Sequence, residues 1–375
     1  MKHVLLAARI ILGLVFIFSG FVKAIDPLGF AYKLDDYFMA FGIDWMMPLS
    51  LPISILVNTA EMLVGLSILL GIKMKVGAWG GLLFMVFFTP LTLYVAVFNP
   101  VSDCGCFGDA IKISNWETFY KNIVFLALAI FIFVNRHKVK PFWSEKKDWY
   151  ILFAGGLAGV LLAVYCLRNL PIIDFRPWKV GNNVLELMQG EPEVAEFFLI
   201  FENSQTGELA EYPAANYPWD DEEWNKVWTF KDQKINVIKP VKPGLIEGFM
   251  INDHLSSDIT EELLLNPDYY FVVVAYNLQK ANTKSLEKRI KPLANEATRN
   301  GFRFFMLTSS PRGEVEEIAS KQALDFEIFQ ADDRNLKTII RSNPGLLLMK
   351  EGVVIANWAH RNIPDFETIK RKYID

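Results

Sequence analysis

Asp103-Cys104-Gly105-Cys106-Phe107-Gly108-Asp109 is a paired-thiol segment between two strongly apolar stretches of the chain. It holds two of the three cysteines in the sequence, with a single glycine between them. Three cysteines are too few for a disulfide scaffold. Two thiols this close together can form a disulfide, so the chemistry of the loop depends on the compartment that it faces.

The composition changes along the 375 residues, a length that allows more than one domain. Residues 1–170 are dominated by apolar side chains and glycine, whereas residues 171–375 have the composition of an ordinary soluble protein. The formal net charge of -4 argues against a nucleic-acid partner, which would require a basic face.

Five apolar stretches each have about the 20 residues that a bilayer requires; they are 4–23, 51–71, 76–98, 118–135 and 148–167. The first lacks a small-residue cleavage site and runs directly into further apolar stretches, so we expect it to be retained. The fold class predicted is a membrane all-α helical bundle, four spans plus a fifth, followed by a soluble α/β domain.

Lysine and arginine in short loops predict the orientation. One side collects Lys2, Lys73, Lys75, Arg136, Lys138, Lys140, Lys146 and Lys147, whereas loops 24–50 and 99–117 on the other side hold only Lys33 and Lys112. The first side, with the basic loop 136–147, should be cytoplasmic. The thiol loop and everything after the fifth span then face outward, which in a Gram-negative inner membrane is the periplasm, where disulfides persist.

Charge occurs inside the predicted spans: Arg9 lies in the first, and Glu61 lies near the middle of the second. An ion inside a membrane is costly and is usually paired or functional. One interpretation is a structural Arg9–Glu61 pair; the other is that Glu61 handles protons near a quinone bound with help from Arg9. Thr89 precedes Pro90, whose expected kink would leave room for a ligand, so Thr89 is a further candidate cofactor-binding residue.

The thiol pair allows four interpretations. A Cys104–Cys106 disulfide would close a small, strained ring, which favours a redox pair, and Gly105 supplies the backbone freedom it needs. The alternatives are a structural disulfide, a metal site (disfavoured because the loop has no histidine) and inert thiols. The flanking acidic residues, Asp103 and Asp109, should raise the thiol pKa values. Cys166, at the end of the fifth span, is either a resolving thiol or a small buried residue.

Several of these segments resemble a known family. Arg9-Ile10-Ile11-Leu12-Gly13, the run Ser19-Gly20-Phe21-Val22-Lys23 before Asp26-Pro27, the mid-span Glu61 and the Cys-Gly-Cys-Phe-Gly-Asp string are similar to the DoxX/MauE group of four-helix membrane proteins over about residues 1–135. The resemblance implies thiol or sulfur redox chemistry at the membrane, since MauE-type members are tied to disulfide formation and DoxD-type relatives to quinone reduction. The layout with a fifth span and a long C-terminal domain is similar to DoxX proteins of Bacteroidetes.

The soluble half begins with a membrane-exit segment, 170–178, in which Trp178 is expected at the membrane interface. We divide this half into a linker and β-rich subdomain (168–246) and a second domain (247–375). The β-rich part should contain a hairpin with a turn at 204–207. The acidic, aromatic segment 217–224 is interpreted as a solvated loop with its tryptophans anchored, and alternatively as a partner-binding lip.

From residue 247 onward strands alternate with helices. We predict strands at 270–276, 302–307, 326–329, 345–350 and 353–358, and helices at 260–265, 284–299, 313–323, 332–341 and 363–373. The order resembles the thioredoxin fold, particularly its TlpA/peroxiredoxin-like branch. Residues 249–260 are similar to that branch's first hairpin, and Asn343-Pro344 stands where the family keeps a cis-proline.

That resemblance implies a domain without redox chemistry. The family's Cys-x-x-Cys position here reads Asn277-Leu278-Gln279-Lys280, and no cysteine follows Cys166. The domain would then be a binding module or a scaffold. A cis bond before Pro344 would leave a groove for an extended peptide lined by Asn277 and Asn343; the alternative is an ordinary helix-to-strand turn.

The sequence therefore predicts an inner-membrane thiol redox protein. Cys104 and Cys106 would pass electrons between a periplasmic protein partner and membrane quinone, with Glu61 as a proton carrier. No spacing of Cys or His supports heme, flavin or iron–sulfur. The alternative is a non-enzymatic scaffold or assembly factor whose periplasmic domain binds partner proteins.

Overall fold

The computed structural model describes residues 1–101, 103–139 and 145–375. The predicted basic loop 136–147 therefore lies partly outside the described residues, with Lys140 among those excluded. In the described part of the chain, five helices are long and apolar enough to cross a membrane. They are α1 (Lys2–Ile25), α3 (Ser50–Leu70, extended by a 3₁₀ turn Asp44–Leu49), α4 (Met74–Phe98), α5 (Asn115–Asn135) and α6 (Glu145–Arg168). The five predicted spans are confirmed as helices of this kind.

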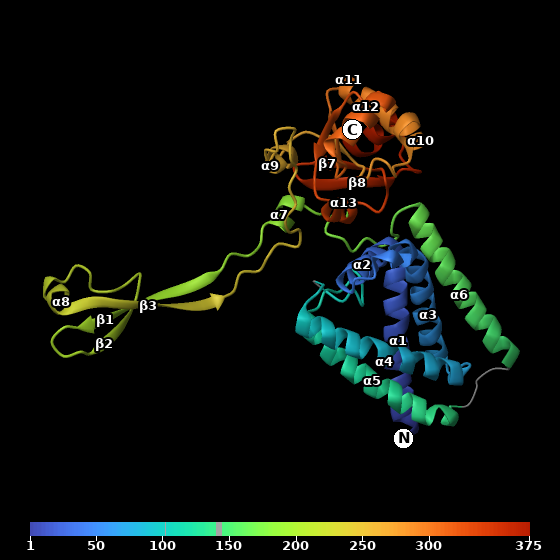
Figure 1. Ribbon diagram of the computed structural model, residues 1–375, viewed down its shortest axis with the longest axis horizontal. Helices are drawn as coiled ribbons and strands as arrows, with labels where there is room; N and C mark the ends of the chain where they lie inside the picture. The colour runs from blue at the N-terminus through green and yellow to red at the C-terminus, as the bar shows by residue number, and fades with distance from the viewer. Residues whose placement is uncertain (102, 140–144) are drawn as a thin grey trace.

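Small residues allow α1 and α3 to pack closely. A side chain at Gly20 would put its Cβ 2.6 Å from the Asn58 carbonyl oxygen, and one at Gly65 would lie 2.7 Å from the Gly13 carbonyl oxygen. Helices in membranes associate through such close backbone approach, because the lipid supplies no hydrophobic driving force between them. The pair α1–α3 forms the axis of the bundle, with α4 and α5 on one side and α6 on the other (Figure 1).

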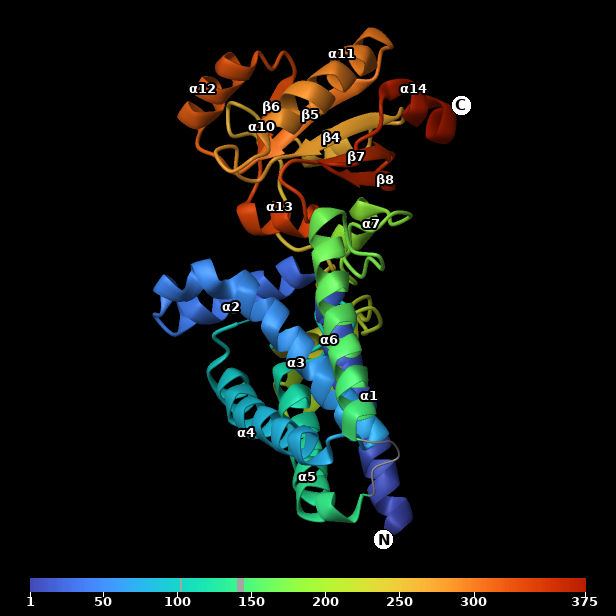
Figure 2. The ribbon, with the colours of Figure 1, turned by 90° about the vertical axis from the view of Figure 1, so that its right-hand side faces the viewer.

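A helix also forms where the sequence predicted only a loop. α2 (Pro27–Ala40) begins with Pro27 at its first turn, and the Asp26 side chain caps it by accepting a hydrogen bond from the Gly29 N–H at 2.9 Å. Its 14 residues are too short to span a bilayer, so it gave no signal in a search for spans. α2 crosses the end of the bundle that faces the C-terminal region, here called the thiol end (Figure 2).

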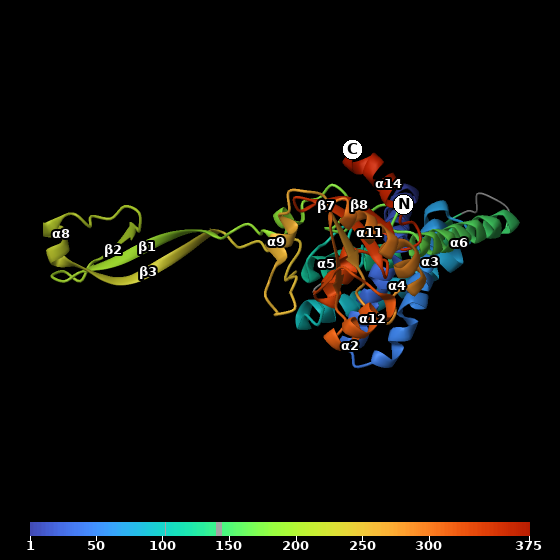
Figure 3. The same cartoon turned by 90° about the horizontal axis from the view of Figure 1, so that it is seen from above.

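A long antiparallel sheet projects away from the rest of the molecule (Figure 3). This arm consists of β1 (Val194–Asn203), β2 (Leu209–Pro213) and β3 (Trp228–Lys239) in the order β2-β1-β3, with α8 (Glu222–Val227) at its tip. The predicted turn at 204–207 is confirmed. Trp224 is anchored against Phe201, with ring centroids 4.6 Å apart, but Trp219 is 68% exposed, so the expectation that both tryptophans are anchored is wrong for Trp219.

The C-terminal region is a five-stranded mixed sheet in the order β6-β5-β4-β7-β8. Its strands are β4 (Tyr270–Val274), β5 (Arg303–Thr308), β6 (Glu327–Gln330), β7 (Gly345–Lys350) and β8 (Val353–Ala359). Its helices are α7 (Val184–Met188), α9 (Thr260–Leu264), α10 (Thr283–Ser285), α11 (Lys291–Arg299), α12 (Arg312–Gln322), α13 (Asp333–Ile339) and α14 (Phe366–Ile369). β4, β5 and β6 are parallel, whereas β7 is antiparallel to β4 and β8. The predicted alternation of strands and helices is confirmed, with ends that differ by a few residues.

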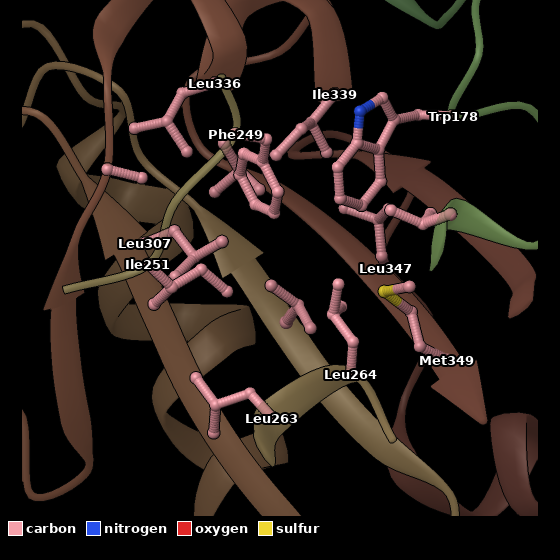
Figure 4. Close-up of a cluster of buried hydrophobic side chains, with 14 of the residues drawn as sticks. Trp178, Phe249, Ile251, Leu263, Leu264, Leu307, Leu336, Ile339, Leu347 and Met349 are labelled. Atoms are coloured by element: carbon pink, nitrogen blue, oxygen red, sulfur yellow. The ribbon is translucent and has the colours of Figure 1, made fainter. Parts of the chain in front are cut away.

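Each face of this sheet is covered by its own apolar cluster. In one of them, the Trp178 ring packs edge-on against Phe249 with centroids 5.0 Å apart, and Trp178 is 3% exposed (Figure 4). The expectation that Trp178 lies at the membrane interface is therefore wrong. Burying so large a side chain in the sheet's own core removes more apolar area from water than an interfacial position would.

Candidate functional site

The thiol loop joins α4 to α5 at the thiol end of the bundle. Cys104 and Cys106 are both half-buried free thiols, and the Cys106 N–H donates to Cys104 Sγ at 3.2 Å. Gly105 between them has φ +66°, and a Cβ there would lie 2.7 Å from Lys33 Cγ. Both the conformation and the space therefore require glycine at this position.

The two thiols are electrostatically unequal. The side-chain hydrogen bond from the Cys106 thiol lowers the pKa of Cys104 to about 6, with further help from the Cys106 backbone N–H, Lys121 and Thr118, while burial opposes this shift. The same hydrogen bond and burial raise the pKa of Cys106. Cys104 is thus largely thiolate at neutral pH, and the thiolate is the nucleophilic form.

The acidic residues beside the cysteines are balanced by cations. Asp103 accepts from Lys33 at 3.0 Å, and Asp109 lies 3.5 Å from the Arg341 guanidinium and 3.8 Å from Lys112 Nζ. The expectation that the two carboxylates raise both thiol pKa values is therefore wrong for Cys104. The cations that cancel them come from other parts of the chain and cannot be placed from the local sequence.

Glu61 forms an ion pair inside the bundle. Its carboxylate accepts from Lys23 Nζ at 2.7 and 2.9 Å, with side chains 4% and 3% exposed. Ser19 Oγ lies 3.0 Å from Glu61 Oε2 and 2.9 Å from the carbonyl oxygen of Cys106, so one hydroxyl contacts both the ion pair and the thiol loop.

The structural pair expected between Arg9 and Glu61 is wrong. Arg9 lies 14 residues before Lys23 on α1, about 21 Å along a helix that rises 1.5 Å per residue. It donates instead to the carbonyl oxygens of Ile68 and Leu69, at 2.9 and 3.1 Å, at the opposite end of the bundle. The end of α3 supplies those carbonyls because its last turn has no following helical N–H groups.

A cavity of about 370 Å³ brings the thiols and the ion pair together. Its wall is mainly apolar, formed by side chains such as Phe30, Phe38, Phe88, Leu91 and Phe125. Its polar lining residues are Ser19, Lys23, Tyr37, Glu61, Thr92, Cys104, Cys106, Lys121 and Asn122.

Two of the predicted cofactor-binding residues lie elsewhere. Neither Arg9 nor Thr89 is among the residues that line the cavity. Thr89 is buried, and its hydroxyl has no hydrogen-bond partner among the described residues. Thr92, one helical turn later, lines the cavity instead and accepts from Asn122 at 3.1 Å.

Sequence reasoning missed Ser19, Lys23 and Lys121 as site residues. A usable signal existed for two of them, because Ser19 and Lys23 are four residues apart and so share one face of α1. Lys121 also carried a signal, as a charge inside the predicted span 118–135, but its relation to the thiols depends on how α5 packs. Cys166 is 2% exposed and does not line the cavity, as expected for a small residue buried at a helix end.

The residues predicted to bind a partner lie where the C-terminal region meets the bundle. The bond Asn343–Pro344 is cis, and the Asn343 side-chain amide donates to the Asn277 carbonyl at 2.7 Å. Next to them, Tyr276 and Tyr32 of α2 approach with hydroxyl oxygens 3.4 Å apart. The edge expected to receive an external peptide therefore faces α2 of the same chain.

Arg341 makes the principal contact between the two regions. Its side chain is 6% exposed and lies 2.8 Å from Asp26 and 3.5 Å from Asp109 in the thiol loop. A polar cavity of about 450 Å³ surrounds these contacts, and Gly105 and Gly108 line it from the thiol loop. The loop thus separates an apolar cavity within the bundle from a polar cavity beneath the C-terminal region.

Comparisons place the site in a family of membrane proteins. No curated protein and no solved structure matches the chain. Residues 1–135 match the family model described as methylamine utilisation protein MauE. The part of the chain that holds the thiol loop and the Lys23–Glu61 pair is therefore a MauE-family membrane domain.

Proposed function

We propose that the protein is an inner-membrane thiol–disulfide redox protein that passes electrons between a periplasmic protein and membrane quinone through Cys104 and Cys106. The observation that carries the proposal is the shared cavity, which holds both thiols and the buried Lys23–Glu61 pair. The loop charges support a cytoplasmic N-terminus and a periplasmic C-terminal region.

The cavity suits a quinone ring. About 370 Å³ lies in the range of small-molecule pockets, and aromatic and aliphatic walls with a few polar groups are typical of them. Lys121 and Asn122 could donate hydrogen bonds to the ring oxygens from α5. Quinone would supply a two-electron, two-proton acceptor that reaches the site from the bilayer.

The reaction balances without another cofactor. Oxidation of the dithiol forms one S–S bond and releases two electrons and two protons, which reduce one quinone to one quinol. In this direction a thiolate of the partner's dithiol attacks the Cys104–Cys106 disulfide, so the partner leaves as a disulfide and the pair becomes the dithiol. Cys104, as the thiolate, then closes the internal bond while quinone takes the two electrons. Cys106 holds its proton until that step, and Glu61 with Lys23 provides a buried group that exchanges protons with the cavity.

The C-terminal region has a supporting role in this proposal. We propose that residues 247–375 form a thioredoxin-like domain without redox cysteines, joined by a linker and β-rich part at 168–246. Tyr276, beside its edge at Asn277, Asn343 and Pro344, contacts Tyr32 of α2 at the thiol end of the bundle. It would present the partner protein to the thiol loop rather than exchange electrons itself.

A second candidate is a scaffold or assembly factor, and the arm favours it. Phe197, Phe230 and Trp219 on the arm are 51%, 57% and 68% exposed, far from the thiol loop along the chain. Exposed apolar side chains grouped on one projecting element are typical of surfaces that bind other proteins. In that function Cys104 and Cys106 would form a permanent structural bridge.

The redox state of the pair in intact cells separates the two functions. Thiols are trapped with a mass-tagged alkylating agent, with and without respiratory quinone, in the wild type and in Cys166→Ser, which removes the one thiol outside the pair. A redox protein accumulates the dithiol form when quinone is depleted, and Cys104→Ser abolishes the response. If the Cys104–Cys106 pair stays oxidised under both conditions, the electron-transfer proposal is rejected and the scaffold function is the one that stands.

A further inference from the structure

A basic pocket lies where the last membrane helix meets the C-terminal region. Its volume is about 470 Å³, and its described lining residues include no carboxylate. Five Arg or Lys side chains and one histidine line it: Arg168, Lys284, Lys288, Arg289, Arg361 and His360.

These cations have no acidic partner among the residues that the structure describes. The ion pairs among the described residues involve other lysines and arginines, so none of the five has a carboxylate partner. Burial and the positive charges of Arg361 and Arg289 lower the pKa of His360. Like charges gathered around one hollow repel each other unless an anion is present.

The pocket is held at the bilayer surface. Arg168 is the last residue of α6, the fifth membrane helix. The next residue, Asn169, accepts from the Asn362 side-chain amide at 2.7 Å, which ties the helix end to the loop after β8. A charged residue at the end of a span lies at the level of the lipid head groups.

An apolar surface leads from the pocket along the helix. Leu161, Tyr165 and Arg168 are spaced i, i+4, i+7 and so share one face of α6. Leu161 and Tyr165 are 58% and 54% exposed. A basic pocket above an exposed apolar helix face is complementary to an anionic amphiphile. The pocket would hold the head group, and the helix face would contact the acyl chains.

We infer that this pocket binds the phosphate head group of an anionic phospholipid in the leaflet next to the C-terminal region. Arginine and lysine side chains around one hollow are the groups that recognise phosphate oxygens. Basic pockets beside membrane helices bind anionic lipid heads in the same way. The site is separate from the thiol cavity, so the inference does not depend on the redox proposal.

Lipid retention by the full-length protein tests the inference. The protein is purified in detergent with phosphatidylglycerol or phosphatidylcholine, and bound lipid is counted by native mass spectrometry. The pocket variant is Lys288→Gln with Arg361→Gln, and the matched control is Lys321→Gln with Arg299→Gln. The control removes the same charges from exposed positions at the ends of α12 and α11, outside the pocket.

We expect the wild type and the control to retain more phosphatidylglycerol than phosphatidylcholine. In the pocket variant, the ratio of retained phosphatidylglycerol to phosphatidylcholine should fall at least tenfold. If the two variants retain phosphatidylglycerol equally, the inferred lipid site is wrong. Glycerol phosphate added without lipid tests whether the pocket binds a soluble phosphate compound rather than a lipid head group. If it binds the wild type as tightly as phosphatidylglycerol does, the ligand is a soluble phosphate and the lipid assignment is overturned.

Discussion

Lys23, in the last turn of α1, and Glu61 of α3 form a buried ion pair near the thiol loop, with 2.7 Å between Nζ and Oε1. The two side chains are 3% and 4% exposed, so almost no solvent screens the pair. The Lys23 ammonium also lies 4.7 Å from the centre of the Phe30 ring. Two ions held this deep place a fixed dipole beside the thiols, which an apolar core would not provide.

Removing one partner of this pair should destabilise the membrane domain strongly. Lys23→Met leaves the Glu61 carboxylate buried without a counter-ion, at a cost of about 3–5 kcal/mol. Lys23→Met combined with Glu61→Gln removes both charges and should recover most of that loss. Thermal unfolding in detergent measures both effects, and a double variant no more stable than the single one contradicts the pairing.

If Glu61 exchanges protons, the rescued double variant should fold but react slowly with quinone. In the reconstituted protein, its oxidation of the Cys104–Cys106 dithiol by added quinone should be at least tenfold slower than in the wild type. Unchanged oxidation would leave the pair with a purely structural function.

The pH dependence of alkylation should distinguish Cys104 from an ordinary thiol. Because its pKa is lowered to about 6, the alkylation rate should rise through pH 6 and reach a plateau by about pH 7. An ordinary cysteine would rise around pH 8.5. The measurement uses fully reduced protein and mass spectrometry of the peptide that contains Cys104.

The cause of that shift is testable in the same experiment. The hydrogen bond with Cys106 is the largest contribution, so Cys106→Ala should move the midpoint of Cys104 upward, toward the ordinary value. A midpoint that stays near pH 6 in this variant would assign the shift to the backbone N–H of residue 106 and to Lys121, which the substitution leaves in place.

The membrane spans and the order of strands and helices could be predicted because each depends on a local sequence pattern. A span shows as a long apolar stretch, and the C-terminal region shows as strand patterns that alternate with helix patterns. The Lys23–Glu61 pair could not, because a charge inside a span shows only that a partner exists. Both Arg9 and Lys23 of α1 could have paired with Glu61. The position along α1 that lies beside Glu61 of α3 decides that Lys23 is the partner, and this position depends on how the two helices pack. Likewise, Trp178 follows a membrane exit, and the contact with Phe249 that buries it spans 71 residues of sequence.

Arg341 should hold the C-terminal region on the thiol end of the bundle. Its guanidinium is buried between Asp26 and Asp109, so Arg341→Ala leaves two carboxylates facing each other and should weaken docking by about 3–5 kcal/mol. Proteolysis of the 168–178 segment and alkylation of the loop thiols should both become faster.

Arg334→Ala is the matched control for this change. Arg334 also pairs with α2, at 3.2 Å from Asp36, but its side chain is 77% exposed. An exposed pair contributes at most about 1 kcal/mol, so proteolysis should stay near the wild-type rate. Equal effects of the two variants would show that docking does not depend on the buried arginine.

The arm should be removable without loss of the fold. Its base is closed by paired backbone hydrogen bonds between Glu191 and Lys242, at 2.9 and 3.0 Å, so a short glycine turn could join residues 192 and 241. Neither apolar cluster of the C-terminal sheet includes a residue of β1, β2 or β3. The shortened protein should therefore keep its thermal unfolding midpoint, measured in the same detergent as the wild type.

The same deletion separates the two proposed functions. A redox protein that acts through the thiol loop should still oxidise its dithiol with quinone after the arm is removed, because no arm residue lines the thiol cavity. Capture of a partner protein should fail if the exposed aromatic side chains of the arm bind it. Phe230→Ser in the intact arm tests this contact with one change, since Phe230 is 57% exposed and its loss should leave the fold unaffected. Loss of quinone-linked oxidation in the deletion would place the arm within the redox function.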